Sequence, residues 1–223
     1  MGAAVLRKDF ESLLGGHLDW QSRRLPELAA TGVAAIDAAT GGLPRGCLTE
    51  IFGPASSGRT SLLHSILAEA TGRGEVCALV DAEDAFDPQS AAAAGVRLER
   101  LLWVRCGGAE QALRAADLLI QGGGLGVVAM DFGDTPAGSV RRISLTSWFR
   151  LRRAVEHTPA VLVTVARQSN ARTCASLMLE CGPPGAEWNG ALGTSRLLLG
   201  MRVQVARRKP GRAVTARFEA ARS

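Results

Sequence analysis

Apolar and polar positions alternate along the chain in blocks that predict an alternating α/β fold. Short apolar runs, typical of buried parallel strands, recur between stretches whose apolar residues are three or four positions apart. The expected strands are 48–53, 76–81, 101–105, 126–131 and 160–165, and the expected helices are one ending near Ala70, 89–94, 110–121 and 144–156. Strands that alternate with helices imply a mostly parallel central sheet flanked by helices.

The last third of the chain has a different pattern. Further strands are expected at 174–181, 197–206 and 213–219, and Lys209-Pro210-Gly211 predicts that the last two form an antiparallel hairpin. Residues 182–193 are rich in Gly and Pro and are expected to form a loop. We expect a helical N-terminal arm over residues 1–30 and one core domain over residues 31–223.

A phosphate-binding loop follows the first expected core strand. The segment from Gly53 to Thr60 reads G-P-A-S-S-G-R-T and differs from the nucleotide-binding pattern G-x-x-x-x-G-K-[ST] only at Arg59. In such a loop, backbone N–H groups and a helix N-terminus hold phosphate, and the final hydroxyl binds Mg²⁺. The candidate cofactors are therefore ATP and Mg²⁺. The candidate contacts are Gly53, Ser56, Ser57, Gly58, Arg59 and Thr60.

Arg59 stands where the pattern has lysine. The chain has 24 arginines and only two lysines, so a general preference for arginine is one explanation. A lysine ammonium is a compact point charge, whereas a guanidinium is a broad planar fork, so the two interchange poorly at a phosphate site. The substitution predicts ATP binding that is weak or absent, and hydrolysis that is slow or lost.

Charge is unevenly distributed along this basic chain, whose formal net charge is +5. Residues 141–153 contain five arginines without an acid, and residues 202–222 contain seven basic residues with Glu219 as the only acid. Such clusters bind nucleic acid or an acidic protein, or they form a solvated face. The basic candidates for an interface or for DNA are Arg141, Arg142, Arg150, Arg152, Arg153, Arg207 and Lys209.

Composition limits the remaining classes. Tyrosine is absent and aromatic residues make up 4% of the chain, which argues against a base-stacking platform. No apolar stretch reaches the roughly 18 residues of a membrane span. The five cysteines lack metal-ligand spacing. Several lie in apolar runs, which is typical of small buried thiols in a reduced, cytoplasmic protein.

Several segments together resemble the RecA recombinase family. They are 31–46 before the phosphate loop, the loop 53–58 itself, D-A-E-D-A-F-D-P at 81–88, and E-Q-A-L at 110–113. The resemblance is specific over residues 31–131. It implies that Glu83 is the general base for the attacking water and that Asp131, at the end of its strand, is the aspartate of the Mg²⁺ site. It also implies that Asp87 faces the adenine. It also makes Gln168 the candidate sensor of the γ-phosphate.

Several segments depart from the RecA pattern, and these departures point to one branch of RecA-related proteins. Residues 169–173 occupy the place of RecA's long DNA-binding loop, and residues 141–153 occupy the place of its earlier DNA loop. We expect no counterpart of RecA's C-terminal domain. Arg207 and Lys209 fall where RecA has two lysines that reach a neighbouring subunit's ATP. This combination resembles the ImuA branch, also labelled SulA-like, of damage-induced mutagenesis.

The ImuA resemblance implies an accessory protein of the SOS response that supports translesion synthesis. Its implied partners are RecA, the polymerase-like protein ImuB and a translesion polymerase, with DNA as a further candidate through the basic clusters. The favoured mechanism is capping, in which the chain joins a RecA filament and modulates its activity. The alternatives are a DNA-dependent ATPase or recombinase paralogue that uses Glu83 and Asp131, and a cell-division inhibitor.

Overall fold

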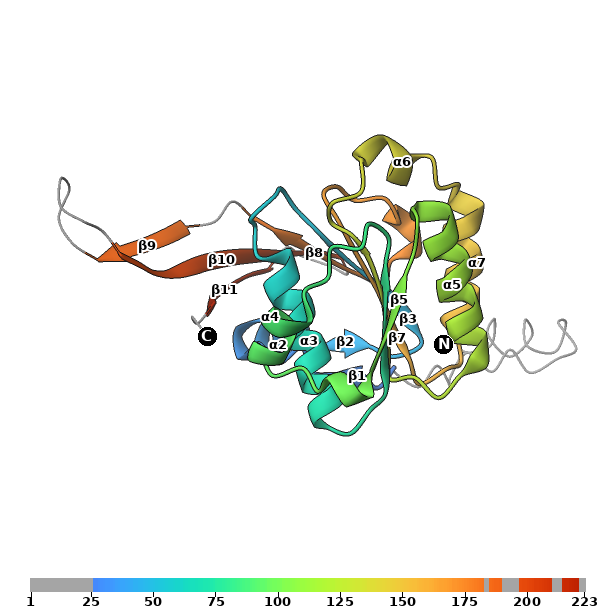
Figure 1. The fold of residues 1–223 in the computed structure, drawn as a ribbon, viewed down its shortest axis with the longest axis horizontal. Helices are drawn as coiled ribbons and strands as arrows, with labels where there is room; N and C mark the ends of the chain where they lie inside the picture. Colours follow the sequence, from blue (N-terminus) through green and yellow to red (C-terminus); the bar gives the residue numbers. More distant parts are fainter. Residues whose placement is uncertain (1–25, 183–184, 190–196, 210–213, 221–223) are drawn as a thin grey trace, which may run out of the picture.

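A nine-stranded mixed sheet forms the centre of the molecule (Figure 1). The structure is a computed structural model that describes residues 26–182, 185–189, 197–209 and 214–220, with side chains as far as Gly182. Six neighbouring strands are parallel, in the order β8-β3-β7-β6-β4-β5. Their bounds are Leu177–Cys181, Cys47–Phe52, Val161–Ala166, Val127–Phe132, Cys77–Asp81 and Leu101–Arg105. The sequence prediction of an α/β fold with a mostly parallel sheet is confirmed.

Helices cover both faces of the parallel strands (Figure 1). On one face lie α2, α3 and α4, and on the other lie α5 and α7. Their bounds are Ala34–Thr40, Arg59–Gly72, Pro88–Ala93, Ala109–Gly122 and Leu145–Val155. Successive strand residues point to opposite faces, so Leu79 packs in one core cluster and Val80 in the other. Burial of both faces explains why these strands are almost wholly apolar.

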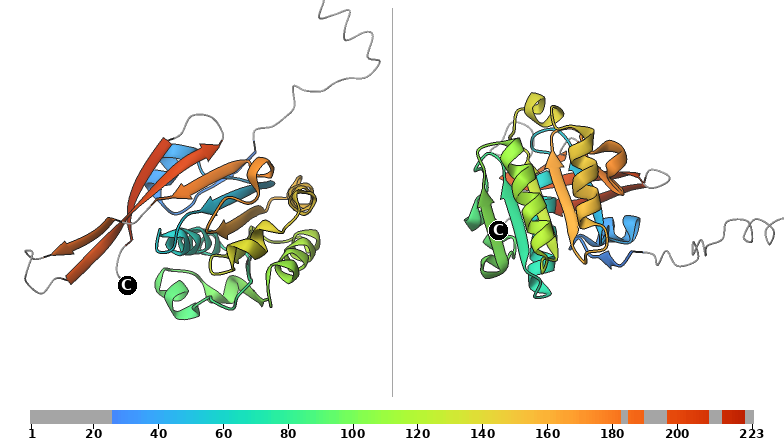
Figure 2. Two further views of the ribbon diagram at one scale, coloured as in Figure 1. Left: turned by 90° about the horizontal axis from the view of Figure 1, so that it is seen from above. Right: turned by 90° about the vertical axis from the view of Figure 1, so that its right-hand side faces the viewer.

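Antiparallel strands extend the sheet beyond β8. Strand β10, Leu197–Lys209, pairs with β8, with β11, Val214–Ala220, and with β9, Gly185–Asn189. The predicted hairpin is therefore confirmed. Figures 1 and 2 show β9 and the adjoining half of β10 projecting away from the body.

Some boundaries differ from the sequence prediction. The expected loop over 182–193 contains β9, whose residues pair with β10 despite the surrounding Gly and Pro. The expected strand over 174–181 begins only at Leu177, because residues 172–174 form a 3₁₀ turn, η3. Sequence reasoning missed the short elements α2, α6 (Ala137–Arg141), β1 (Leu28–Ala29) and β2 (Leu43–Pro44). The helical arm expected over residues 1–30 is wrong at its end, where Leu28–Ala29 pair with β2 as a strand. Residues 1–25 lie outside the described part, so the helix stays a prediction there.

The parallel register brings the carboxyl ends of four strands to one edge of the sheet. Phe52 of β3 lies opposite Ala166 of β7, which in turn lies opposite Phe132 of β6. Asp131 of β6 also lies opposite Asp81 of β4. Ligands of open α/β sheets bind outside these carboxyl ends. The loops that follow these four strands therefore form the candidate site.

Candidate phosphate-binding site

The loop between β3 and α3 has the geometry that the sequence pattern requires. Gly58 has φ 85° and precedes the first residue of α3, so a residue tolerant of the left-handed region is needed there. Gly53 lies against the neighbouring strand, where an added Cβ would be 2.3 Å from the Cys181 carbonyl oxygen. Ser56 also has positive φ, 57°, and its side chain is exposed. The strand–loop–helix arrangement is as expected, and phosphate binding stays a prediction.

Two buried polar groups of the loop have no hydrogen-bond partner among the described residues. The Ser57 side chain is 1% exposed with an unpaired Oγ, and Arg59 is 7% exposed with an unpaired Nη1. Buried polar atoms are paired in the great majority of cases, and an unpaired one costs about 1–3 kcal/mol. Four other buried side-chain atoms of the described residues are also unpaired, at Thr49, Asp117, Thr135 and Thr164. Phosphate oxygens bound in the loop would supply partners for Ser57 and Arg59.

The Arg59 guanidinium turns toward β6. A Cβ added to Gly133 would lie 3.6 Å from Arg59 Nη1 and 2.9 Å from Asp131 Oδ1. Arg59 and Asp131 therefore border the same small space beside Gly133, although no ion pair within 4 Å joins them in the described part of the chain. Burial lowers the pKa of the Arg59 guanidinium, and the nearby Asp131 charge opposes that shift. The charge of Arg59 is thus held at the end of β6.

Asp131 is a perturbed carboxylate. Its Oδ1 accepts a hydrogen bond of 2.7 Å from the Gly133 N–H. Burial raises the pKa of Asp131 to about 6; the Gly133 hydrogen bond opposes that rise, and the neighbouring Asp81 adds to it. Desolvation disfavours the charged form of an acid, and Arg59 compensates only in part.

Arg59 limits the fit of Mg²⁺ at Asp131. Thr60 is exposed, and the Asp131 carboxylate lies beside the Arg59 guanidinium at the end of β6. Mg²⁺ at a nucleotide site is held in near-octahedral geometry by one or two protein oxygens together with substrate phosphates and waters. A fixed cation beside this carboxylate competes with a divalent ion for the same negative charge.

Asp81 is a structural carboxylate that the sequence analysis did not single out. It is 2% exposed and accepts hydrogen bonds from the N–H groups of Glu83, Ala85 and Phe86, at 3.3, 3.1 and 2.9 Å, and from Trp103 Nε1 at 3.2 Å. These bonds shape the loop after β4 and leave the Glu83 side chain exposed. The available signal was an acid at the end of an apolar strand. The catalytic role of Glu83 stays a prediction.

Asp87 caps its own helix. Its carboxylate accepts hydrogen bonds from the Ser90 hydroxyl and from the N–H groups of Gln89 and Ser90, which lower the pKa of Asp87. Such a cap provides acceptors for N–H groups that lack a partner in the first turn of a helix. Asp87 therefore has a structural role in α4, and its predicted contact with adenine is untested.

Glu50, in the middle of β3, anchors the turn after β7. Its fully buried carboxylate accepts hydrogen bonds from Ser169 Oγ at 2.7 Å, Asn170 N at 2.5 Å and Ala171 N at 2.9 Å. This short turn occupies the place that the RecA resemblance gives to a long DNA-binding loop. Gln168, at the start of the turn, has an exposed side chain, so its role as a phosphate sensor stays a prediction. An acid inside an apolar strand was the signal for Glu50.

The basic candidates lie apart from the phosphate loop in sequence and differ in their contacts. The five arginines between 141 and 153 are exposed, on α6, α7 and the segment that joins them. Arg150 pairs with Asp117 of α5 at 3.5 Å, and Arg142 donates to Ser139 Oγ at 3.3 Å. Arg207 and Lys209 lie on β10, opposite Leu179 and Met178 of β8, and their side chains are outside the described part. Their predicted roles remain untested.

The fold and the loop define an α/β protein with a phosphate loop. Comparison with known proteins identifies its family. Residues 15–137 match the model of the RecA N-terminal domain, which is more than half of the chain. The chain belongs to this RecA family. We also find no helix in the described residues that is long and apolar enough to cross a membrane.

Three curated relatives are named "Protein RecA". Identity is 36% over 160 residues with the Chloroflexus aurantiacus protein, covering 65% of this chain and 46% of the relative. Identity with the Symbiobacterium thermophilum protein is 36% over 182 residues, covering 74% of this chain and 52% of the relative. It is 45% over 107 residues with that of Paramagnetospirillum magneticum, covering 47% and 30%. The chain thus spans about half the length of the first two and less of the third.

Replacing Asp131 by Asn is expected to stabilise the protein at pH 8 and to have little effect at pH 4. The folded-state pKa of about 6 lies above the unfolded value near 3.9, so the favourable contribution is complete below pH 4 and is lost as pH rises through 6. Asn carries no charge and keeps an acceptor for the Gly133 N–H. The expected gain in unfolding free energy at pH 8 is roughly 2 kcal/mol.

Urea unfolding at the two pH values measures this difference, with Glu99→Gln, a change at an exposed acid, as the control. An equal effect of Asp131→Asn at both pH values would show that its carboxylate is not perturbed in the folded protein.

Replacing Glu50 by Ala is expected to destabilise the protein by about 3 kcal/mol or more. The change leaves the Asn170 and Ala171 N–H groups without their buried acceptor, and bonds to a charged group contribute about 1.5–3 kcal/mol each. Urea unfolding at pH 7 is the measurement, and Glu99→Ala is the matched control. A loss below about 0.5 kcal/mol, as is usual for surface changes, would mean that Glu50 does not hold the turn.

Proposed function

We propose that this RecA-family chain is a cytoplasmic accessory protein of the SOS response. In this proposal it supports translesion synthesis by binding RecA and a mutagenic polymerase complex that contains ImuB, and it modulates RecA activity. The observation that carries the proposal is the buried Arg59 beside Asp131. That arrangement alters the part of a phosphate site on which turnover depends.

Phosphoryl transfer relies on cations that stabilise charge on the transferring group. In phosphate-loop enzymes a lysine contacts the β- and γ-phosphates, and an aspartate together with a hydroxyl holds Mg²⁺. Here the guanidinium that replaces the lysine lies beside the aspartate and competes with a metal ion for its negative charge. The Glu83 carboxylate is exposed to solvent. These observations support slow hydrolysis or none.

The loop geometry supports a weak phosphate site. Gly53 and Gly58 retain the backbone path, and the unpaired Ser57 Oγ and Arg59 Nη1 would gain partners from phosphate oxygens. Arginine binds phosphate well when it can present its fork to two oxygens. A nucleotide would therefore meet a cradle that binds it without the groups that drive its cleavage.

The turn at residues 169–171 supports a role that does not depend on a long DNA loop. Glu50 fixes this turn against the end of β7, which leaves little freedom to follow a DNA strand. The capping mechanism needs one face that meets RecA, and Arg207 and Lys209 on β10 are the candidates for it. The alternative, a DNA-dependent ATPase that uses Glu83 and Asp131, predicts the opposite behaviour in turnover assays. We find no structural observation that favours a cell-division inhibitor.

ATP turnover is expected to be far below the usual enzyme range of ~1–10³ s⁻¹, and single-stranded DNA is expected not to stimulate it. The measurement is phosphate release by the purified chain with and without a single-stranded oligonucleotide, with RecA as the positive control. DNA-stimulated turnover close to that of RecA would support the enzyme alternative and reject the accessory proposal.

Restoring lysine with Arg59→Lys is expected to raise nucleotide affinity about tenfold in the presence of Mg²⁺. The ammonium is smaller than the guanidinium and would free the space beside Asp131. Calorimetric titration with ADP measures the change. Arg73→Lys, on an exposed pair at the other end of α3, is the matched control. An affinity that the Arg59 change leaves the same or lowers would show that Arg59 does not limit the site.

Substoichiometric addition of the chain is expected to reduce RecA strand exchange or ATPase activity. The double change Arg207→Ala with Lys209→Ala should relieve the inhibition, because loss of an interfacial charge contact mainly speeds dissociation. A matched double change, Arg97→Ala with Arg114→Ala, removes two exposed charges elsewhere. If the unmodified chain neither inhibits RecA nor is recovered with it in a pull-down, capping is excluded and a role with the polymerase complex alone remains.

A further inference from the structure

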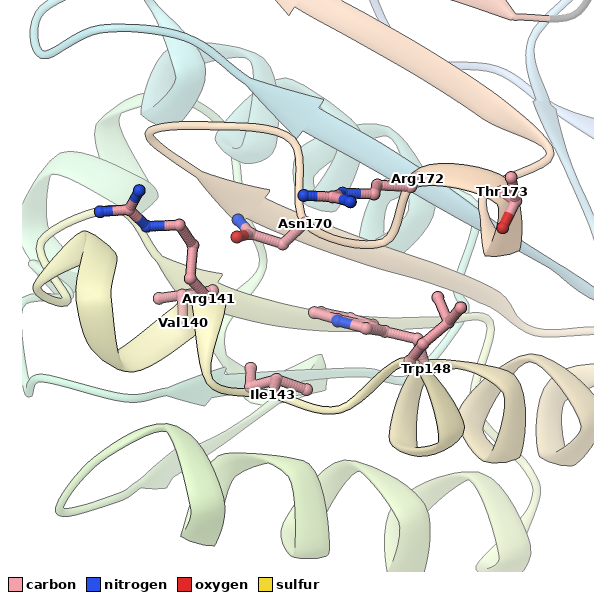
Figure 3. Close-up of a pocket in the computed structure, with 8 residues that line it drawn as sticks. Val140, Arg141, Ile143, Trp148, Asn170, Arg172 and Thr173 are labelled. Atoms are coloured by element: carbon pink, nitrogen blue, oxygen red, sulfur yellow. The ribbon is translucent and has the colours of Figure 1, made fainter.

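A pocket of about 430 Å³ lies between the α6–α7 segment and the turn at η3 (Figure 3). Val140, Ile143 and Trp148 line it from the α6–α7 side, and Asn170 and Arg172 line it from the turn. Arg141 adds a second guanidinium at the end of α6. The volume is within the range of about 300–1,000 Å³ that is usual for ligand sites. The pocket is thus a mixed site with aliphatic walls and two cations.

The two arginines of the pocket are exposed and form no ion pair with any described residue. Figure 3 shows them on different walls, with Asn170 between them in this view. No acid lines the pocket in the described part of the chain. The buried Glu50 carboxylate already accepts hydrogen bonds from Ser169, Asn170 and Ala171 of the turn. The pocket therefore presents uncompensated positive charge beside apolar surface.

The position of Arg172 is enforced by its surroundings. Arg172 has φ 48°, a left-handed conformation that costs a residue with a side chain about 1 kcal/mol or more. On one side Ala171 is fully buried and donates to Glu50, and on the other Cys174 is fully buried. The backbone on both sides of Arg172 is thereby fixed. The exposed Arg172 side chain then lies at the pocket. Backbone strain that persists beside an open pocket is typical of a binding site.

The chemistry of the walls favours a peptide over a nucleic acid. Single-stranded nucleic acid is bound by exposed aromatic faces and by a continuous track of cations. Trp148 is only 1% exposed, so its ring packs in the core and offers no stacking face. Arg152 and Arg153 belong to the last turn of α7, whereas the pocket contacts only its first turn. An aliphatic side chain next to a carboxylate matches these walls.

We infer that this pocket binds an acidic, apolar peptide segment of a partner protein. One carboxylate of the segment would lie between Arg141 and Arg172 and accept one hydrogen bond from Asn170 Nδ2, whose other hydrogen is donated to the Gln168 carbonyl oxygen at 2.6 Å. A neighbouring Leu-like or Phe-like side chain would pack on Ile143 and on Leu145, which is 49% exposed at the pocket. Recognition of acidic motifs by arginines is an established mode of peptide binding. The inference rests on the pocket alone and not on the nucleotide site.

The test uses the full chain and a fluorescein-labelled ten-residue peptide that alternates Asp with Leu. Binding with micromolar Kd is expected by fluorescence anisotropy, at least tenfold weaker when Asn replaces every Asp or Ser replaces every Leu. Arg141→Gln and Arg172→Asn should each weaken binding about tenfold, because a hydrogen bond to a charged group is removed. Asn is chosen at 172 because it tolerates the left-handed region. Arg153→Gln, the matched loss of charge outside the pocket, should leave the affinity within twofold.

Three results would overturn the inference. The first is the absence of binding at a peptide concentration of 1 mM. The second is binding that Arg153→Gln weakens as much as Arg172→Asn, since that pattern describes general attraction to a basic surface. The third uses an unlabelled 20-nucleotide single strand as competitor: displacement of the peptide by micromolar DNA, with the same dependence on Arg172, would assign the pocket to nucleic acid. A shift of the Trp148 indole N–H signal by NMR on adding peptide should report occupancy of the pocket directly.

Discussion

The buried guanidinium of Arg59 beside Asp131 is the constraint on which the candidate site depends. Arg59 begins α3, Asp131 lies near the end of β6, and the missing side chain of Gly133 leaves the space that both border. A positive charge that belongs to the chain thus lies next to the carboxylate that would otherwise hold a metal ion. Desolvation shifts the pKa of both groups toward their neutral forms, and each partly offsets the shift of the other.

Two further buried acids determine how the surrounding loops are arranged. Asp81 binds three backbone N–H groups of the loop that carries Glu83, and Glu50 binds the turn that follows Gln168. Buried carboxylates need such partners, because an unpaired charge in the interior is strongly unfavourable. The same bonds direct the Glu83 and Gln168 side chains to solvent and bring Arg172 to the pocket. Hydrogen bonds from loop N–H groups to buried carboxylates therefore determine both the shape of the loops and the exposure of the candidate residues.

Much of the fold follows from the sequence because its signals are local. Strand β5 begins and ends where the apolar run predicts, and the glycines of the phosphate loop are needed for the reasons that the motif implies. Strand β9 was missed because Gly and Pro surround it and its pairing partner β10 is supplied by the tertiary fold. Helix α6 has five residues, too few for a hydrophobic period to show.

The candidate site was only partly predictable. The loop and Asp131 could be located from the motif and the resemblance, but the direction of the Arg59 side chain depends on Gly133, which is 74 positions away in the chain. The partners of Glu50 lie about 120 residues further along, so no local pattern reveals them. The pocket is formed by one segment that precedes β7 in the sequence and one that follows it, and it has no sequence motif of its own.

The central claim is that Arg59, and not a metal ion, provides the positive charge beside Asp131. Calorimetric titration of the chain with ADP, once with Mg²⁺ and once with EDTA, tests it most directly. The account predicts weak binding whose Kd agrees within about threefold between the two conditions, since a fixed guanidinium needs no metal to neutralise the phosphates. Binding that becomes tenfold tighter with Mg²⁺ would contradict it, because a metal would then hold the position that the structure gives to Arg59.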